Sequence, residues 1–420
     1  MSRWLFALAV LVAAGSARAA AVERLVIISI DGLRPEFYLP DSALATNCPN
    51  LVKLRDAGSY ARSAIAVHPS MTYPGHASIA TGVNPDRHGV TANTVFVPGE
   101  EGRGFWFASD LKVPALWDVA HVAGLKVGAV SWPTTGGART IDWNIAEFWS
   151  TAAGTQAQMM RQHSTPGLVG ELPKAADWPA WDAYVARQAV RILQEHRPDL
   201  LLVHFVEPDK VQHRGGRAAA ELPAAMQRVD RWTAEVVAAA GAAATVIVVG
   251  DHGFRDVQHT VAPNVALARE GWITVTEGKV TGWRAFVENT GGSARVHLRD
   301  AADRAAVVTL LAEAGRDLWE VTDGEPVWLE AQPGKMFSGS FQGTNLVRRA
   351  SIKGNHGYGP ETPEMRTGFL IAGRGVKAGV ILEQISLLDV APTAAALLGV
   401  KMHDVEGRVL RELMDEKAGR

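Results

Sequence analysis

The chain has 420 residues, of which 47% are hydrophobic and 20% are charged, and its formal net charge is −2. These values are typical of a globular protein with a large buried core, and they provide no basic surface that would bind a polyanion. Polymeric nucleic acid is therefore not expected as a partner. Because Cys48 is the only cysteine, an internal disulfide is excluded.

The first 19 residues have the features of a signal peptide. Arg3 precedes an apolar run from Trp4 to Ala14, and Ala17-Arg18-Ala19 provides a small-x-small cleavage site. The run is too short to span a membrane, and no later segment is predicted to do so. We therefore expect cleavage near Ala19 and a product that is periplasmic or secreted. The sequence leaves the oligomeric state open.

Beyond residue 20, short apolar segments alternate with helical segments. Strands are predicted at Leu25–Ile30, Lys126–Val130, Leu200–Val206, Thr245–Val249 and Gly368–Ala372. Helices are predicted at Pro49–Ala57, Pro74–Thr81, Pro114–Ala123, Trp181–His196, Leu222–Ala240 and Leu387–Leu398. This alternation predicts a doubly wound α/β fold with a mainly parallel central sheet, built from residues 20–260 and 351–420.

Residues 261–350 have a different pattern, in which short strands surround one helix. The strands are predicted at Trp272–Glu277, Trp283–Val287, Ala294–Leu298 and Glu325–Leu329, and the helix at Ala302–Ala314. We predict a smaller α+β insertion here. Because it lies between two groups of candidate metal ligands, it should flank or cap the active-site cleft.

Those candidate ligands follow apolar segments of the chain. They are three aspartates and three histidines: Asp31, Asp209, His213, Asp251, His252 and His356. A single aspartate after a strand is often only a helix cap or turn residue. However, parallel sheets bind ligands at the carboxyl ends of their strands, so we expect this set to meet there. Six such residues can hold two metal ions.

Thr72 supplies a hydroxyl next to the turn-forming Pro74-Gly75, and it is the candidate nucleophile. Mixed imidazole and carboxylate ligands without thiolate favour zinc, with manganese second, whereas magnesium or calcium would prefer oxygen ligands alone. Three carboxylates and a Thr72 alkoxide would balance two divalent cations, so the site would not repel a monoanionic diester. His76 lies one helical turn after Thr72, and we expect it to pack rather than to bind metal.

The order and spacing of these segments resemble the nucleotide pyrophosphatase/phosphodiesterase branch of the alkaline phosphatase superfamily over nearly the whole mature chain. The matching stretches are Ile30-Asp31-Gly32-Leu33-Arg34, Thr72-Tyr73-Pro74-Gly75-His76, Thr81-Gly82, Pro85-Asp86-Arg87-His88-Gly89-Val90, Asn93, Ser131-Trp132-Pro133, Glu207-Pro208-Asp209 with His213, Gly250-Asp251-His252-Gly253 and Gly354-Asn355-His356-Gly357-Tyr358.

The resemblance implies an alkaline phosphatase-like three-layer α/β/α sandwich and two Zn²⁺ ions. It assigns one zinc to Asp209, His213 and His356, and the other to Asp31, Asp251, His252 and the Thr72 hydroxyl. Asn93 resembles the side chain that supports the phosphoryl oxygen. The implied activity is hydrolysis of phosphodiester or pyrophosphate bonds, with nucleotide-like substrates favoured, through a covalent phosphothreonine intermediate.

Substrate contacts are expected from aromatic residues. Tyr73 stands where the family places an aromatic that stacks on a nucleobase, although it could instead pack under the helix. Trp132 is a further candidate for substrate binding, and Phe96, Trp106 and Trp149 could complete an aromatic wall.

Two positions depart from the family pattern: Met71 stands where many members have lysine, and Gly75 where many have asparagine. With no basic residue predicted beside the nucleophile, we expect diesters to be preferred over dianionic monoesters. The alternatives within the superfamily are a phosphonate hydrolase, a phosphomonoesterase, or a phosphodiesterase acting on glycerol or lipid headgroups. The alternative from another class is a non-catalytic binding protein.

Overall fold

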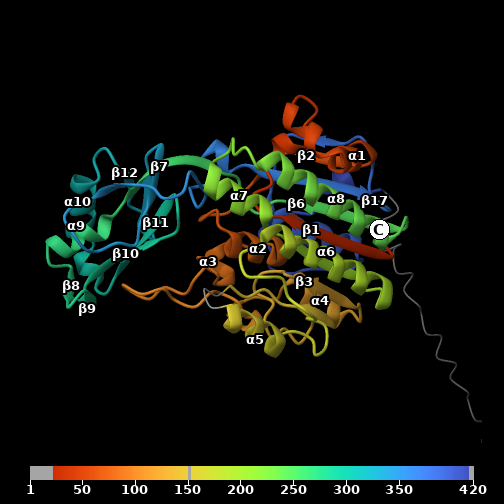
Figure 1. Ribbon diagram of the computed structural model, residues 1–420, viewed down its shortest axis with the longest axis horizontal. Helices are drawn as coiled ribbons and strands as arrows, with labels where there is room; N and C mark the ends of the chain where they lie inside the picture. The colour runs from red at the N-terminus through yellow and green to blue at the C-terminus, as the bar shows by residue number, and fades with distance from the viewer. Residues whose placement is uncertain (1–21, 150–152, 416–420) are drawn as a thin grey trace, which may run out of the picture.

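The computed structural model describes residues 22–149 and 153–415 (Figure 1). The predicted signal peptide lies outside these residues. Within them, nine strands form the main sheet in the order β18-β2-β17-β6-β1-β5-β3-β4, with β19 paired to β2. Their bounds are β1 Arg24–Ile30, β2 Ser59–Ile65, β3 Val127–Val130, β4 Trp143–Ile145, β5 Leu200–Phe205, β6 Ala244–Val249, β17 Thr367–Gly373, β18 Ile381–Leu382 and β19 Ile385–Ser386.

The strands at the centre of the sheet are parallel. β1 pairs with β5 on one side and β6 on the other, and β3 pairs with β5 and β4, all in parallel. β17 is the exception, because it runs antiparallel to both β2 and β6. The prediction of a mainly parallel central sheet is therefore confirmed.

Helices cover both faces of this sheet and make a three-layer sandwich (Figure 1). One face carries α1 (Pro49–Ala57), α6 (Trp178–Glu195) and α8 (Leu222–Ala240), and the other carries α2 (Thr72–Thr81), α4 (Leu116–Val122) and α11 (Val390–Leu397). Successive residues of β1 serve both layers: Val26 and Ile28 belong to the core under α6 and α8, and Ile27 to the core under α4 and α11. Strands buried on both faces explain the continuous apolar runs in the sequence.

Shorter helices lie at the carboxyl edge of the sheet or beside it. They are α3 Pro85–His88, α5 Ala153–His163 and α7 Glu207–Gly215. β2 and α7 were not predicted, since β2 mixes polar and apolar residues and α7 is short and charged. The predicted helices α1 and α8 have the observed bounds.

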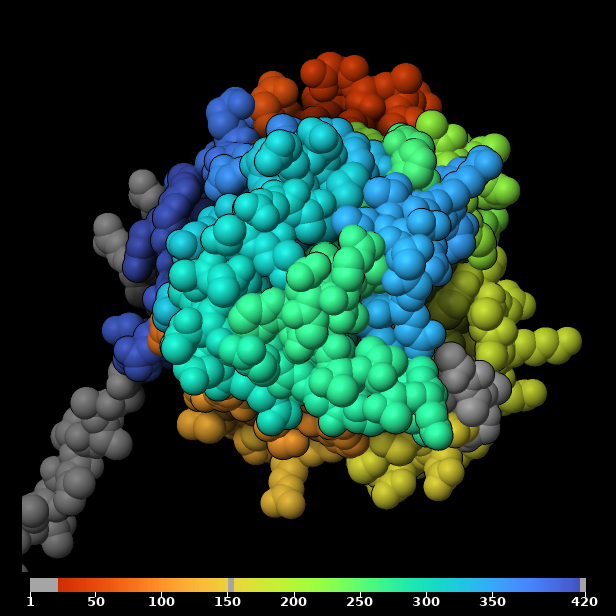
Figure 2. All heavy atoms as spheres, turned by 90° about the vertical axis from the view of Figure 1, so that its left-hand side faces the viewer, coloured from red at the N-terminus to blue at the C-terminus, as the bar shows by residue number. Residues whose placement is uncertain are grey.

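The segment between the main-sheet strands β6 and β17 forms three small sheets, with strand orders β10-β11-β13-β12, β14-β7-β15 with β16 on β7, and β8-β9. The strands are β7 Arg255–Val261, β8 Ile273–Thr276, β9 Lys279–Trp283, β10 Ala285–Asn289, β11 Ser293–Leu298, β12 Trp319–Thr322, β13 Trp328–Ala331, β14 Gly334–Phe337, β15 Val347–Arg349 and β16 Gly354–Asn355. They enclose a separate apolar core with α9 (Pro263–Arg269) and α10 (Arg304–Ala314). The segment forms the left-hand end of the molecule in Figure 1, and in the view from that end it covers most of the face (Figure 2).

For two strands of this segment, the predicted bounds differ from those in the structure. The predicted strand Trp283–Val287 is divided by Arg284 between β9 and β10. The predicted strand at Glu325–Leu329 begins later, at Trp328, because Pro326 has no backbone N–H to donate to a ladder.

None of the helices within residues 22–149 and 153–415 combines the length and the apolar composition that a membrane span requires.

Candidate metal centre and catalytic cleft

The fold brings the predicted ligands together at one edge of the main sheet. β6, β1 and β5 are neighbours and run parallel, so their carboxyl ends meet. Asp251 follows β6, Asp31 follows β1, and α7 with Asp209 and His213 follows β5. The acidic residues therefore converge because of sheet order, although they are far apart in the sequence.

His356 reaches the same place through the small sheets. β7 leaves the site just after His252, and β16 returns just before His356. These two strands pair antiparallel, with Asn355 opposite Arg255. The pairing brings the His252 and His356 rings into a stack with centroids 3.6 Å apart.

The ligand atoms form two overlapping groups, Asp31-Asp251-His252 and Asp209-His252-His356, and within each group they lie within 4.8 Å of one another. His252 Nε2 is 3.3 Å from both Asp31 Oδ1 and Asp251 Oδ2. His213 lies beside the second group, with its Nε2 3.3 Å from Asp209 Oδ1. All six predicted ligands are thus assembled in one cluster.

Each imidazole of the cluster is oriented by the backbone so that its Nε2 faces the carboxylates. Nδ1 of His213, His252 and His356 donates to the backbone carbonyls of Gly354, Gly253 and Ser70 at 3.0, 3.1 and 3.0 Å. A carbonyl can only accept, so Nδ1 carries the proton and the Nε2 lone pair faces the carboxylates. Such hydrogen bonds orient histidines that bind metal.

The carboxylates have unused oxygen atoms that point to the same conclusion. Among the described residues, the buried oxygens Asp31 Oδ1, Asp209 Oδ1 and Asp251 Oδ2 have no hydrogen-bond partner. An unpaired buried carboxylate oxygen is costly unless a cation binds it. The donor set of carboxylates and Nε2 atoms therefore fits divalent metal ions, and zinc in particular.

Electrostatics also favour cations at this place. Burial, followed by repulsion from the neighbouring carboxylates Asp209 and Asp251, raises the pKa of Asp31 to about 7. Burial likewise raises the pKa of Asp251 to about 7. Burial and the nearby imidazoles hold the pKa of His356 well below its usual value, so the ring is neutral and free to bind metal.

Local structure fixes the start of α7, which carries Asp209 and His213. The Asp182 carboxylate of α6 accepts hydrogen bonds from the backbone N–H groups of Val206 and Glu207, each at 2.9 Å. These are N–H groups that an isolated helix would leave unpaired, and Pro208 has none to satisfy. One turn later, His213 lies on the same helix face as Asp209.

Thr72 is the first residue of α2 and faces the ligands, with its Oγ1 3.4 Å from His252 Nε2. Its backbone lies at a helix N-terminus, where free N–H groups favour an anion. A Cβ at Gly75 would come within 3.1 Å of the Asp251 Cβ and carbonyl oxygen, so the glycine lets α2 approach the ligand loop closely. The Gly75 departure is therefore a packing feature of this chain.

Asn93 is oriented by Tyr73, the residue after the candidate nucleophile Thr72. Its Oδ1 accepts from the Tyr73 backbone N–H at 3.0 Å, which leaves the Nδ2 amide hydrogens available to a phosphoryl oxygen.

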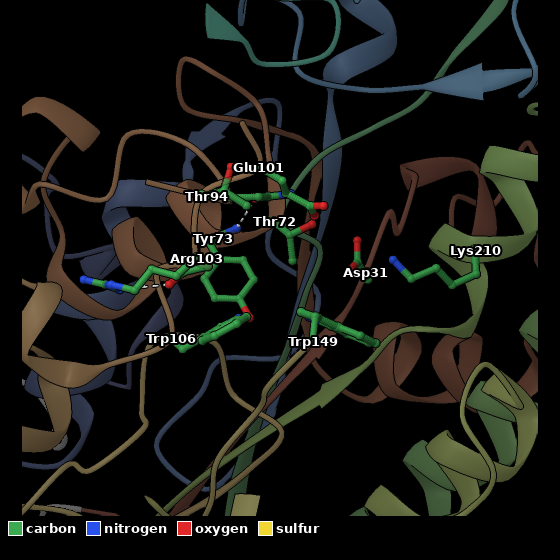
Figure 3. Close-up of a pocket in the computed structure, with 12 residues that line it drawn as sticks. Asp31, Thr72, Tyr73, Thr94, Glu101, Arg103, Trp106, Trp149 and Lys210 are labelled. Carbon is green, nitrogen blue, oxygen red and sulfur yellow. Dashed lines mark hydrogen bonds between the residues drawn. The ribbon is translucent and has the colours of Figure 1, made fainter. Parts of the chain in front are cut away.

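An open cavity of about 560 Å³ adjoins the cluster (Figure 3). Asp31, Thr72 and Asn93 line it near the ligands, and Tyr73, Trp106 and Trp149 form an aromatic wall. Tyr73 is only 2% exposed, and its hydroxyl donates to Glu147 at 3.0 Å. Tyr73 therefore both packs and borders the cavity.

Two other aromatic residues that were predicted to contact substrate or to complete the wall do not line this cavity. Trp132 is fully buried in the core beside α4 and packs edge-on against His76, with centroids 5.0 Å apart. The prediction that it contacts substrate is corrected, because the chain turns at Ser131 (φ 57°) and Trp132 joins the core instead of the cavity. Phe96 stacks on His297 of the insertion, with centroids 3.8 Å apart.

A basic residue that the sequence analysis overlooked lies in the cavity. The expectation that no basic side chain stands near the nucleophile was based on Met71, which is not among the cavity-lining residues. Lys210 lines the same cavity as Thr72 and Asp31, and its Nζ lies 2.9 Å from Asp209 Oδ2. The premise of that expectation is therefore wrong.

A buried network behind the ligands was also missed. His204, inside β5, places Nε2 3.3 Å from Asp31 Oδ2 and Nδ1 2.9 Å from Glu147 Oε2. Burial opposes its protonation, yet Glu147 and Asp31 raise the pKa of His204 well above its usual value. The one available signal was a histidine within an otherwise apolar strand. His76 packs as predicted, since its Nδ1 donates to the Thr72 carbonyl at 2.7 Å.

A mainly parallel α/β sheet carries a cluster of aspartates and histidines at the carboxyl edge of its central strands, an arrangement suited to a metal-dependent hydrolase. Residues 25–359 match the family described as Type I phosphodiesterase / nucleotide pyrophosphatase. The chain belongs to this family. It is a family of hydrolases, as the resemblance predicted.

Curated relatives match part of the chain. Venom phosphodiesterase 2 of Crotalus adamanteus is 26% identical over 213 residues, which are 49% of this chain and 23% of the relative. Human ectonucleotide pyrophosphatase/phosphodiesterase family member 1 is 25% identical over 215 residues, 49% of this chain and 20% of the relative. The matched region thus spans less than a quarter of the length of these relatives.

Solved structures agree in fold. Murine ectonucleotide pyrophosphatase/phosphodiesterase 5 superposes with a TM-score of 0.68 over 93% of this chain and 100% of its own, at 19% identity. An inactive variant of the same murine protein, in complex with AMP, gives a TM-score of 0.68 over 94% of this chain at 18% identity. The alkaline phosphatase-like fold is confirmed.

Proposed function

We propose that this protein is a two-zinc hydrolase that cleaves phosphodiester or pyrophosphate bonds of nucleotide-like substrates. The proposal rests on the meeting of Thr72 with six candidate ligand side chains, five of them buried and the sixth, His213, beside Asp209. Asp209, His213 and His356 would hold one ion, and Asp31, Asp251, His252 and Thr72 the other. Manganese is the second choice for the same donors.

When bound, the ions supply the positive charge that lowers the pKa of the Thr72 hydroxyl and of a water, and that stabilises the leaving oxygen. Thr72 Oγ1 attacks phosphorus in line as the bond to the leaving oxygen breaks, and a phosphothreonine forms. Water then attacks the phosphorus from the side that the leaving group vacated, and the threonine oxygen is released.

Asn93 holds the reacting group during both steps. Its amide hydrogens, freed by the bond from Tyr73 N–H to Oδ1, donate to a non-bridging phosphoryl oxygen. At the start of α2, the Thr72 backbone N–H is a further donor at the same place. The aromatic wall of Tyr73, Trp106 and Trp149 provides flat apolar surface for a nucleobase. The relative crystallised with AMP supports a nucleotide as substrate.

The test is hydrolysis of bis(4-nitrophenyl) phosphate and of a nucleoside 5′-(4-nitrophenyl) phosphate by the purified zinc-loaded protein. We expect turnover of both, with close to two zinc equivalents bound. A sample that holds zinc but hydrolyses neither would support the alternative of a non-catalytic binding protein.

A phosphomonoesterase is the second candidate, because Lys210 brings a positive charge into the cavity. Phosphonates and glycerol or lipid-headgroup diesters are further candidate substrates for the same nucleophile, and comparing the hydrolysis rates of these classes would show which is preferred.

We also propose that residues 261–350 act as a cap subdomain on a catalytic domain of residues 20–260 and 351–420. Removal of a signal peptide near Ala19 would deliver the enzyme to the periplasm or outside the cell, and N-terminal sequencing of the mature protein tests this.

A further inference from the structure

Lys210 is a basic residue inside the cavity that the proposed reaction does not use. Lys210 follows the ligand Asp209 on α7, and its side chain remains 29% exposed. In the close-up its ammonium group points toward Asp31, on the side of the cavity opposite Tyr73 and Trp106 (Figure 3).

The surroundings of Lys210 hold its ammonium group in place but leave donors unused. Among the described residues, its one hydrogen bond goes to Asp209 Oδ2, at 2.9 Å. The ring centroids of Trp149 and Trp178 lie 5.1 and 5.5 Å from Nζ, close enough for cation–π contacts. An ammonium has three N–H donors, so the others can bind an anion in the cavity.

Arg103, the other basic residue that lines the cavity, is already paired. Its NH1 and NH2 donate to the two oxygens of Asp110 at 2.8 and 2.6 Å. Its guanidinium also points away from Asp31 in the close-up (Figure 3). Lys210 is thus the cavity cation with capacity for a ligand.

Charge indicates what that ligand is. Two divalent cations, three ligand carboxylates and a Thr72 alkoxide sum to zero, and Lys210 adds one positive charge next to them. The other charged residues that line the cavity are Arg103, which is paired with Asp110, and the exposed Glu101. A monoanionic diester does not need this charge beyond what the ions supply. A substrate with one more negative charge on phosphate would use it.

We propose that Lys210 is a specificity-determining residue that binds a second negative charge on a phosphate of the substrate. This proposal rests on the proposed phosphoester hydrolysis and deepens it. The charge can have two sources: the reacting phosphate itself, when the substrate is a monoester, or a further phosphate elsewhere on a nucleotide. Both present the same oxygen acceptors to the Lys210 ammonium.

Binding to a variant that cannot turn over separates the two sources. Zinc-loaded Thr72→Ala and Thr72→Ala/Lys210→Gln are titrated by calorimetry with AMP methyl ester, AMP and adenosine 3′,5′-bisphosphate. If the charge is on the reacting phosphate, Lys210→Gln weakens AMP about tenfold relative to its methyl ester. If the charge is on a further phosphate, Lys210→Gln weakens the binding of adenosine 3′,5′-bisphosphate about tenfold relative to the binding of AMP. Both ratios staying within about twofold of the parent would overturn the proposal.

Steady-state kinetics test the role of Lys210 independently of the binding titrations. In the otherwise unmodified enzyme, Lys210→Gln is expected to lower the kcat/KM ratio of 4-nitrophenyl phosphate to its bis-ester about tenfold if the monoester is the source, whereas Lys210→Arg keeps the ratio. Glutamine can still donate to Asp209, and the zinc content of each variant shows whether the metal site is intact. Lys401→Gln, at an exposed loop position, removes the same charge elsewhere and should leave every ratio unchanged.

The two proposals fail differently. If the wild-type enzyme hydrolyses neither ester, the proposed function is wrong, and the binding titrations still decide the role of Lys210. If it hydrolyses the diester while Lys210→Gln alters neither the binding ratios nor the kinetic ratio, only the role of Lys210 is wrong.

Discussion

The two sides of the cleft are built differently. On the metal side, Asp31, Asp251 and His252 are at most 1% exposed, and backbone carbonyls hold the imidazole rings. On the opposite side, the aromatic wall includes Trp106 and Trp149, which remain partly exposed. On the metal side, bound cations would satisfy the buried carboxylate oxygens that have no hydrogen-bond partner. The second side can be altered at little cost, and it is where substrate choice is expected to vary.

The largest expected effect comes from the metal side. Complete removal of metal should abolish turnover while most of the fold survives, because the two large apolar cores of the sandwich do not include the ligands. His356→Ala and Asp251→Ala should lose zinc and activity together, by about a thousandfold or more. Zinc analysis and diester hydrolysis on the same samples measure both.

The matched control for His356→Ala is His403→Ala, because His403 is exposed and far from the ligands in the chain. It should retain zinc and full activity. Full activity in a sample shown to contain no metal would contradict the two-zinc mechanism.

Thr72 joins the two sides, and its substitution should separate chemistry from metal binding. Thr72→Ala is expected to lower kcat by about a thousandfold or more, since the nucleophile is gone. Zinc content should change little, because Thr72 is one weak ligand beside six strong ones. Thr72→Ser keeps a hydroxyl and should keep part of the activity. Near-normal rates in Thr72→Ala would mean that water attacks phosphorus directly.

The sequence predicted the metal side well, and physical reasons explain why. Parallel strands buried on both faces produce apolar runs that are easily recognised, and they place the next residues at one edge of the sheet, so Asp31 and Asp251 could be brought together without coordinates. A helix was also predicted next to Thr72, although it begins at Thr72 and not at Pro74, so that Pro74-Gly75 lies in its first turn.

The sequence also indicated the aromatic residues Tyr73, Trp106 and Trp149 of the wall, which line the cavity. It did not indicate the charged residues beside them, because these have no local pattern that shows their role. Lys210 reads as an ordinary solvated helix residue, and Glu147 as a charge in a loop. Two partners of Glu147 come from distant parts of the chain: Tyr73 and Glu147 are 74 positions apart, and His204 and Glu147 are 57 apart. Trp132 failed as a substrate contact for the related reason that the direction of a side chain after a strand depends on the backbone at Ser131.

A smaller effect is expected at Asn93, which lies between the two sides. Asn93→Ala should lower kcat about a hundredfold, the order found when one donor to a developing anion is removed. KM should change less, because the donor acts most strongly when charge builds up on the phosphoryl oxygen. Asn93→Asp is the informative partner, since it keeps the acceptor for the Tyr73 N–H but loses the donor. A rate in Asn93→Asp equal to that of the wild type would show that Asn93 only positions Tyr73.

The smallest predicted effect concerns Glu147, which supports the wall from behind. Its Oε1 accepts from the Tyr73 hydroxyl and from Trp149 Nε1 at 3.0 and 2.7 Å, and its Oε2 accepts from His204 Nδ1. Glu147→Gln keeps the size of the side chain but replaces one accepting oxygen with an amide that can only donate. Whichever way the amide turns, a buried donor loses its partner, which costs about 1–3 kcal/mol of stability.

If the network also orients the wall, Glu147→Gln should raise KM for a nucleotide substrate severalfold while KM for bis(4-nitrophenyl) phosphate and kcat for both change less. Denaturant unfolding measures the stability loss, and steady-state kinetics on the two substrates measure the orientation. Glu171→Gln, at an exposed position, is the control for the charge change. Equal rises of KM for both substrates would place the effect on the metal side through His204 and Asp31, and would contradict the division of the cleft into a fixed half and an adjustable half.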